Sequence, residues 1–278
     1  MVQPIFRKLL KYAGLSLFAG LGYCCRPPGI PVLVYHSLDS TNSRISIAPA
    51  IFAMQMEQLD KAGFRVIGLE QFMSAAISRE HPSEKVLVLT FDDGLKNFYE
   101  SAWPILNERG FSATVFVPTD FIGQKSWWYS RYALTPLPML DEKELRELHR
   151  SGVDIQSHGC SHRKLTDLSP PEVDREVRQS KAALERILEK PVDFFCYPFG
   201  EVNQDIVDSV RNAGYKGGIS MVQGLHRKDD NPYMMKRQSL DYISIADGHT
   251  ANLSIKACVF GTFAWYVRAK QTLLRLFA

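Results

Sequence analysis

The sequence predicts an α/β protein in which parallel strands are covered by helices. Short apolar runs alternate repeatedly along the chain with segments of helical periodicity. The chain has 278 residues and 45% hydrophobic content, enough to bury one large core. No linker rich in proline, glycine or serine divides it, so we expect one main domain. The alternation is consistent with a closed barrel and with a doubly wound sheet, and in both the chemistry gathers at the carboxyl ends of the strands.

The expected elements follow in chain order. Strands are expected where short apolar runs occur, at 31–36, 65–69, 85–90, 113–117, 152–157, 192–196, 215–221 and 236–243. Helices are expected between them, at 49–63, 69–79, 97–109, from about 142 onward, at 170–189 and at 203–212. Asp141 with Glu144, and Ser169 with Glu172, have the spacing of capping boxes that open two of these helices.

Two adjacent acids end the most apolar of these strands. Residues 86–91 are followed directly by Asp92, Asp93 and Gly94. The glycine permits a turn sharp enough for both carboxylates to reach one cavity, and like charges this close need a compensating cation. A helix N-cap would explain Asp93, but it leaves Asp92 unexplained.

A histidine pair follows another strand. His158 and His162 are four residues apart, so both imidazoles can face one ion. Two exposed surface histidines would have the same spacing, but the acid pair at a neighbouring strand end favours a metal site. Cys160 lies between the histidines, and we interpret it as a small buried residue and not as a ligand.

Suppose that Asp93, His158 and His162 bind one divalent ion. Three nitrogen and oxygen ligands with open positions are typical of catalytic zinc, and such an ion suits hydrolysis of an amide or ester. Asp92 is then free to act as general base.

Two further groups are needed for such a hydrolysis. The turn at Phe199-Gly200 can offer a backbone N–H to the oxyanion. The candidates for the acid are His36, which ends a strand, and His226. A core histidine bonded to backbone is the alternative interpretation of His36, and a surface histidine is that of His226.

These motifs resemble a known family. Residues 90–94 (TFDDG), 158–162 (HGCSH) and 197–200 (YPFG), within roughly 31–243, resemble the polysaccharide deacetylases of the family four carbohydrate esterases. Residues 34–36 and 52–69 are similar to the branch that includes poly-N-acetylglucosamine deacetylases. The resemblance implies a distorted (β/α) barrel of about seven strands. It also implies an enzyme that removes acetyl from N-acetylated sugars with a divalent metal, most often Zn²⁺.

Carried over by motif, the resemblance assigns roles to five residues. Asp92 matches the catalytic base, and Phe199 matches the residue whose backbone N–H holds the oxyanion. The metal ligands correspond to Asp93, His158 and His162. The family's third motif commonly starts with an arginine that orients the base, and Cys196 stands in that place. The later tryptophan and leucine–histidine motifs are not evident, although Leu225 and His226 have the residue types of the leucine–histidine motif.

The expected substrate is an N-acetylated sugar in a polysaccharide, oligosaccharide or glycolipid precursor. Two alternatives stay open: a non-catalytic, metal-containing glycan-binding protein, and an amidohydrolase on a non-sugar substrate. A net charge of +3 gives no support for nucleic-acid binding. Aromatic residues at 127–129 would suit stacking on a sugar, and packing against the barrel rim explains them equally well.

The two ends are expected to lie outside the catalytic domain, which we place at 31–245. Residues 1–30 are basic and then apolar, which fits a signal peptide, a membrane anchor or an amphipathic helix, and we favour the helix. Residues 246–278 form an amphipathic tail that packs on the domain or contacts a membrane surface. Five scattered cysteines without a C-x-x-C pair suggest free thiols in a reducing compartment. We therefore expect a cytoplasmic protein, peripheral to the membrane, with export or anchoring through 1–30 as the alternative.

Overall fold

The fold is a closed parallel barrel surrounded by helices. The computed structural model describes residues 29–41, 43, 45–77, 85–132, 134–227, 229–239, 255–256 and 258–259. Seven of the eight strands of the main sheet close into a ring, because β1 pairs with both β10 and β5. In order around the ring these strands are β1 (Val32–Tyr35), β10 (Met235–Ser239), β9 (Gly217–Gln223), β8 (Phe194–Cys196), β7 (Asp154–Ser157), β6 (Thr114–Val117) and β5 (Val86–Phe91).

Every neighbouring pair in this ring is parallel. The short strand β4 (Arg65–Val66) extends the sheet from β5, outside the ring. A separate small pair is formed by β2 (Ser37–Leu38) and β3 (Ser46–Ile47). The closed ring confirms the predicted barrel and excludes the doubly wound sheet.

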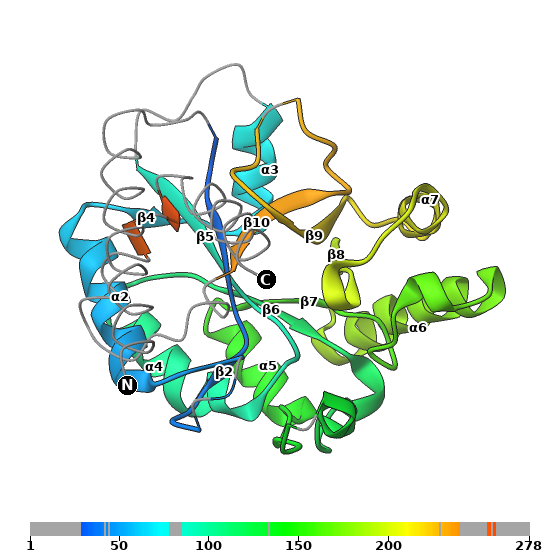
Figure 1. Ribbon diagram of the computed structural model, residues 1–278, viewed down its shortest axis with the longest axis horizontal. Coiled ribbons are helices and arrows are strands. Elements are labelled where there is room, and N and C mark those ends of the chain that lie inside the picture. The colour runs from blue at the N-terminus through cyan, green and yellow to red at the C-terminus, as the bar shows by residue number, and fades with distance from the viewer. Residues whose placement is uncertain are drawn as a thin grey trace, which may run out of the picture.

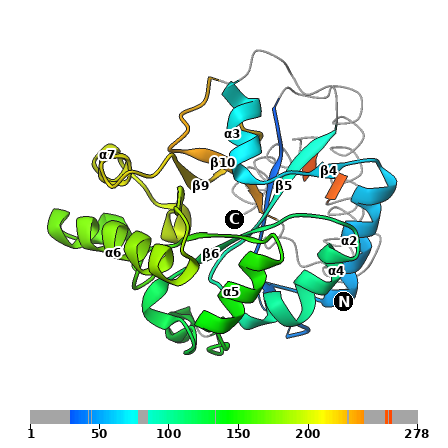
Figure 2. The same ribbon diagram turned by 180° about the vertical axis from the view of Figure 1, so that it is seen from behind.

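Helices lie around the outside of the barrel in both views (Figures 1 and 2). They are α2 (Pro49–Lys61), α3 (Leu69–Ile77), α4 (Trp103–Asn107), α5 (Glu142–Arg150), α6 (Pro170–Leu188) and α7 (Gln204–Asn212). A π-helical turn, η1 (Phe98–Ala102), precedes α4. Four short 3₁₀ segments are also present: η2 (Thr119–Phe121), η3 (Trp127–Tyr132), η4 (Leu165–Asp167) and η5 (Pro198–Gly200).

Alternation along the strands separates two apolar layers. On β5, Leu87, Leu89 and Phe91 belong to the large cluster that also contains buried residues of α2, α4, α5, α6 and α7. Val86 and Val88 belong to the smaller cluster, together with inward residues of β1, β6, β8, β9 and β10. Because successive side chains on a strand point to opposite faces, Thr90 and Asp92 continue the inward row. The strand therefore delivers Asp92 to the carboxyl end of the barrel interior.

Two predicted elements need correction. The helix predicted at 97–109 is divided into η1 and α4, where the N–H of Trp103 bonds to the carbonyl of Phe98. Pro104 has no N–H and cannot continue the regular helical bonding, which favours the wider turn before it. The strand predicted at 65–69 ends at Val66, because Leu69 already begins α3.

Most of the two terminal segments, and the roles predicted for them, lie outside the described residues. The boundaries at 31 and 245 stay predictions. Among the helices that the structure describes, none combines the length and apolar character that a membrane span requires.

Both predicted capping boxes are present, at the starts of α5 and α6. At α6, hydrogen bonds from Ser169 and from Arg163 lower the pKa of the exposed Glu172 carboxyl to about 2, against 4.5 for the free side chain. A lowered folded-state pKa stabilises the fold above the unfolded pKa, and this stability is lost as the pH falls toward the folded value.

We therefore predict that Glu172→Gln lowers the melting temperature near pH 6 and that the difference from wild type closes as the pH falls from about 4.5 to about 2. Thermal unfolding followed by circular dichroism across this range measures it. Glu100→Gln, which removes an exposed carboxylate outside both capping boxes, is the matched control and should keep the wild-type melting temperature near pH 6. A difference at Glu172 that stays constant with pH would contradict the assignment.

Candidate active site

The acid pair lies where the sequence predicts, directly after β5. Asp92 and Asp93 are both buried. Asp93 has a left-handed backbone (φ 71°), and so does Gly94 (φ 59°). A Cβ on Gly94 would lie 3.2 Å from the Val117 side chain, so the tight turn requires glycine on two counts. This turn brings the second carboxylate to the same end of the barrel as the first.

Asp93 and the two predicted histidines form one buried cluster. The Asp93 Oδ1 atom lies 2.9 Å from His162 Nε2 and 3.6 Å from His158 Nε2. His158 Nδ1 lies 2.8 Å from the carbonyl oxygen of Cys196. Because a carbonyl only accepts, Nδ1 carries the proton and Nε2 keeps its lone pair for an ion. The hydroxyl of Tyr129 donates to Asp93 Oδ2 at 2.5 Å.

This cluster has the character of a metal site. Asp93 Oδ1 accepts no hydrogen bond from the described residues, although it is buried and faces two imidazoles. Burial by itself would raise the pKa of Asp93, but the adjacent His162 and His158 hold it well below the usual range, so the carboxylate is ionised. One carboxylate oxygen and two imidazole nitrogens within 4.8 Å of one another fit a divalent ion such as zinc.

A second group of potential ligands, Asp92, His158 and Cys196, meets the same distance criterion. Its chemistry does not suit an ion. Both oxygens of Asp92 already accept hydrogen bonds from a guanidinium. Burial raises the pKa of the Cys196 thiol, which keeps it protonated. The first cluster is therefore the better metal site.

The guanidinium on Asp92 belongs to Arg237 of β10, a residue that the sequence analysis did not single out. Its Nη1 and Nη2 atoms lie 2.7 and 2.8 Å from the two oxygens of Asp92, and its exposed fraction is 0%. Nε donates to the Ser220 carbonyl, and Nη2 lies 3.3 Å from Cys196 Sγ. Burial would raise the pKa of Asp92, but Arg237 outweighs it and lowers the pKa.

Arg237 thus orients Asp92, which is the role that the family resemblance implied for an arginine at position 196. The signal that could have revealed it is an arginine inside a predicted strand, at a position that a closed barrel turns inward.

The two candidate acids, His36 and His226, lie in different parts of the barrel. His36 follows β1, and its Nε2 lies 3.9 Å from Asp92 Oδ2, with 18% of the side chain exposed. His226 pairs through its backbone with Ile30, which precedes β1, and its ring packs on Phe72 of α3. The structure therefore brings His36 to the site and leaves His226 at the opposite end of the barrel. The expectation of a surface histidine at 226 is wrong, because its side chain is buried.

Phe199 lies in η5 with a left-handed backbone (φ 62°), which is unusual for a residue with a side chain. Its ring meets the His162 ring edge-on, with 4.9 Å between ring centroids. The predicted oxyanion turn therefore adjoins the metal-type cluster.

The aromatic residues at 127–129 mainly support the site. Trp128 is buried and stacks on His162, with centroids 4.5 Å apart, and the buried Tyr129 bonds to Asp93. Trp127 is 55% exposed. Packing thus explains two of these residues, and Trp127 is the most exposed of the three.

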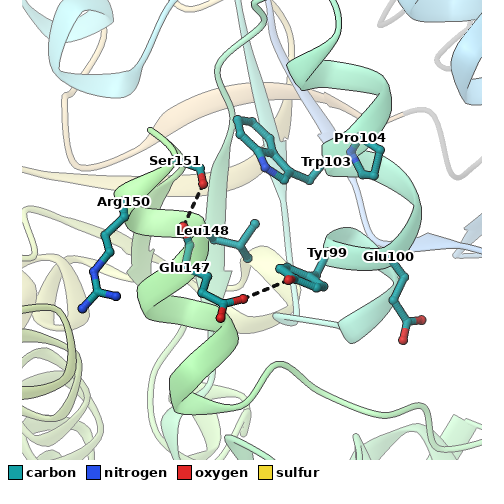
Figure 3. Close-up of a pocket in the computed structure, with 8 residues that line it drawn as sticks. All are labelled: Tyr99, Glu100, Trp103, Pro104, Glu147, Leu148, Arg150 and Ser151. Atoms are coloured by element: carbon teal, nitrogen blue, oxygen red, sulfur yellow. Dashed lines mark hydrogen bonds between the residues drawn. The ribbon is translucent and has the colours of Figure 1, made fainter.

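A hollow of about 360 Å³ opens beside His162. It is lined by Trp128, Arg131, His162, Arg163, Lys164, Asp167 and Phe199. A larger hollow, of about 640 Å³, lies between η1, α4 and α5, where Figure 3 shows Tyr99 reaching across to Glu147. None of the predicted site residues lines this larger hollow, so the smaller one is the candidate substrate cleft.

Comparisons with known proteins agree with this geometry. A family model described as polysaccharide deacetylase matches residues 79–218, a range that contains Asp92, Asp93, His158, His162 and Phe199. The poly-beta-1,6-N-acetyl-D-glucosamine N-deacetylase of Staphylococcus aureus is 24% identical over 214 residues, which cover 74% of this chain and 71% of the relative.

Among solved structures, a Streptococcus pyogenes deacetylase, PplD, in complex with acetate is 25% identical. It has a TM-score of 0.68 and covers 77% of this chain and 93% of its own. IcaB from Ammonifex degensii has a TM-score of 0.67 at 23% identity, covers 76% of this chain and 91% of its own, and supports the barrel fold alone. Since the family model spans half of the 278 residues and includes the acid and histidine motifs, the chain belongs to the polysaccharide deacetylase family.

Proposed function

We propose that this chain is a metal-dependent hydrolase that removes N-acetyl groups from an N-acetylated sugar in a polysaccharide, oligosaccharide or glycolipid precursor. One observation carries the proposal. A buried carboxylate–imidazole cluster lies beside a second carboxylate that a buried arginine holds ionised. The first arrangement suits a cation, and the second suits a general base.

Asp93, His158 and His162 are the residues that would hold the ion, and Zn²⁺ is the ion that we propose for this donor set. A divalent ion there would supply Lewis acidity, which makes a water more acidic and polarises the acetyl carbonyl. Tyr129 keeps Asp93 oriented through its hydroxyl, and the Cys196 carbonyl keeps His158 in the tautomer that leaves Nε2 available.

Asp92 takes the proton of the attacking water. Its lowered pKa leaves it ionised at neutral pH, and the two bonds from Arg237 fix its orientation while other lone pairs stay available. His36, 3.9 Å from Asp92 and partly exposed, gives a proton to the leaving amine. The backbone N–H of Phe199 stabilises the oxyanion.

The proposed sugar class is supported by the family and by the relative in Staphylococcus aureus, whose name specifies poly-beta-1,6-N-acetyl-D-glucosamine. A base without an orienting arginine would favour the non-catalytic alternative, but Arg237 bonds to Asp92 in this chain. An amidohydrolase acting on a non-sugar amide is tested by comparing acetylated sugars with small acylated amines.

The role of the base is tested by Asp92→Asn. Acetate release from N-acetylglucosamine oligomers should fall by roughly 10²- to 10⁴-fold, because an amide cannot accept the proton. Bound metal should stay unchanged, since Asp92 is not a proposed ligand. Asp174→Asn on the exposed face of α6 is the control and should keep wild-type activity. Full activity in Asp92→Asn would disprove the assignment of the base.

The dependence on metal is tested with a chelator. Dialysis against it should abolish acetate release, and added Zn²⁺ should restore it in the wild type but not in His162→Ala, which lacks one ligand. Elemental analysis of the dialysed protein is the control for complete removal. Activity that persists in metal-free protein would rule out this mechanism.

Arg237→Met tests the buried ion pair. Urea unfolding should show a loss of about 3–5 kcal/mol, because the variant leaves a buried carboxylate without its cation. The double variant Asp92→Asn/Arg237→Met should lose less. Arg178→Met, which breaks an exposed pair with Asp174, is the control and should cost under about 1 kcal/mol. Equal losses in the single and double variants would show that the pair itself is not responsible.

A further inference from the structure

Helix α6 presents a fully buried carboxylate, Glu176, to the loop between the two histidines. Its Oε2 accepts hydrogen bonds from the backbone N–H groups of Cys160, at 2.7 Å, and Ser161, at 2.9 Å. Its Oε1 accepts the Ser161 hydroxyl at 2.5 Å. Among the described residues, the nearest cationic group is the Arg175 guanidinium, which lies 4.0 Å from Oε1. A buried carboxylate is costly, and these three short bonds are what stabilise it there.

The two histidines that this loop joins are held differently. His158 has its Nδ1 bonded to a backbone carbonyl. The Nδ1 of His162 is buried and has no hydrogen-bond partner among the described residues. A metal-binding histidine usually has its second nitrogen fixed by such a partner. For His162, the direction of the ring depends instead on packing by Trp128 and Phe199 and on the backbone that leads into it.

That backbone is the segment that Glu176 holds. His162 itself has a left-handed conformation (φ 50°), which an L residue keeps only when its surroundings impose it. The two preceding N–H groups, of Cys160 and Ser161, both end on Glu176. Gly159 lets the loop come this close, because a Cβ there would lie 3.1 Å from Glu176 Oε2. The Cys160 thiol adds a contact to the Glu176 carbonyl at 3.5 Å.

We propose that Glu176 is a positioning residue for the metal site. Through the 159–161 loop, its carboxylate sets the direction in which His162 presents Nε2 toward Asp93. This inference rests on the proposed metal site, but it concerns a residue that touches neither the ion nor the substrate. All three groups that face the carboxylate are donors, so a neutral amide of the same shape would set its own N–H against one of them.

The test is the metal affinity of Glu176→Gln, measured by titrating metal-free protein with Zn²⁺ in competition with a chromophoric chelator. We expect affinity to fall by roughly 10- to 100-fold, as for other groups that orient metal ligands. The visible spectrum of the Co²⁺-loaded variant should differ from that of wild type, because His162 is displaced. Neither readout uses the activity of the enzyme.

Val177→Ala is the matched control. Val177 is the next residue on α6 and equally buried, but it has no polar contact with the loop. The variant should lose thermal stability and keep the wild-type Zn²⁺ affinity and Co²⁺ spectrum. The proposal would be overturned if Glu176→Gln had a Zn²⁺ affinity within twofold of wild type and an unchanged Co²⁺ spectrum.

Two further arms separate the possible failures. If His162→Ala binds Zn²⁺ as tightly as wild type, the metal site itself is overturned, and with it the proposed function. If Glu176→Gln does not fold, Ser161→Ala removes one of the three bonds at a partly exposed position. It should weaken Zn²⁺ binding severalfold, and wild-type affinity in this variant would also overturn the role of Glu176.

Discussion

The buried pair of Arg237 and Asp92 is the interaction on which the site depends. Arg237 comes from β10 and Asp92 from the end of β5, and each strand pairs with β1 on a different side. Arg237 also bonds to the Ser220 carbonyl on β9. One guanidinium therefore joins three strands around the barrel interior. A buried charge without its partner would lower the stability of the fold. The pair therefore constrains both the ring closure and the orientation of the Asp92 carboxylate.

Backbone strain gathers at the same end of the barrel. Among the described residues other than glycine, Asp93, His162 and Phe199 have positive φ angles, and the fourth such residue, Glu189, only ends α6. Such conformations persist where the surroundings hold them. Tyr129 bonds to the first of these residues, and Trp128 stacks on the second. The loop at 127–132 thus acts as a support for the site, and its aromatic character has a structural cause.

The arginine shows how one geometry can arise from different chain positions. The resemblance places an arginine at the start of the motif that here begins with Cys196. The structure has a thiol there and reaches Asp92 from the strand that closes the ring. Because neighbouring strands of a closed barrel aim at one interior, a residue can be replaced in function by one far away in sequence. The chemistry of a site is therefore better judged from its three-dimensional geometry than from its sequence motifs alone.

The sequence by itself determined the features whose causes are local. The alternation of strands and helices, the Asp92–Asp93 turn, the histidine pair and the two capping boxes depend on residues within a few positions of one another. Only the tertiary structure decided the ring closure, the role of Arg237, the burial of His226 and the bracing of the histidine loop by Glu176. Arg237 and Asp92 are 145 positions apart, and Glu176 is 15 or 16 from the groups that it binds. Such contacts leave no periodic pattern in the chain, because they form only when packing brings distant strands and helices together.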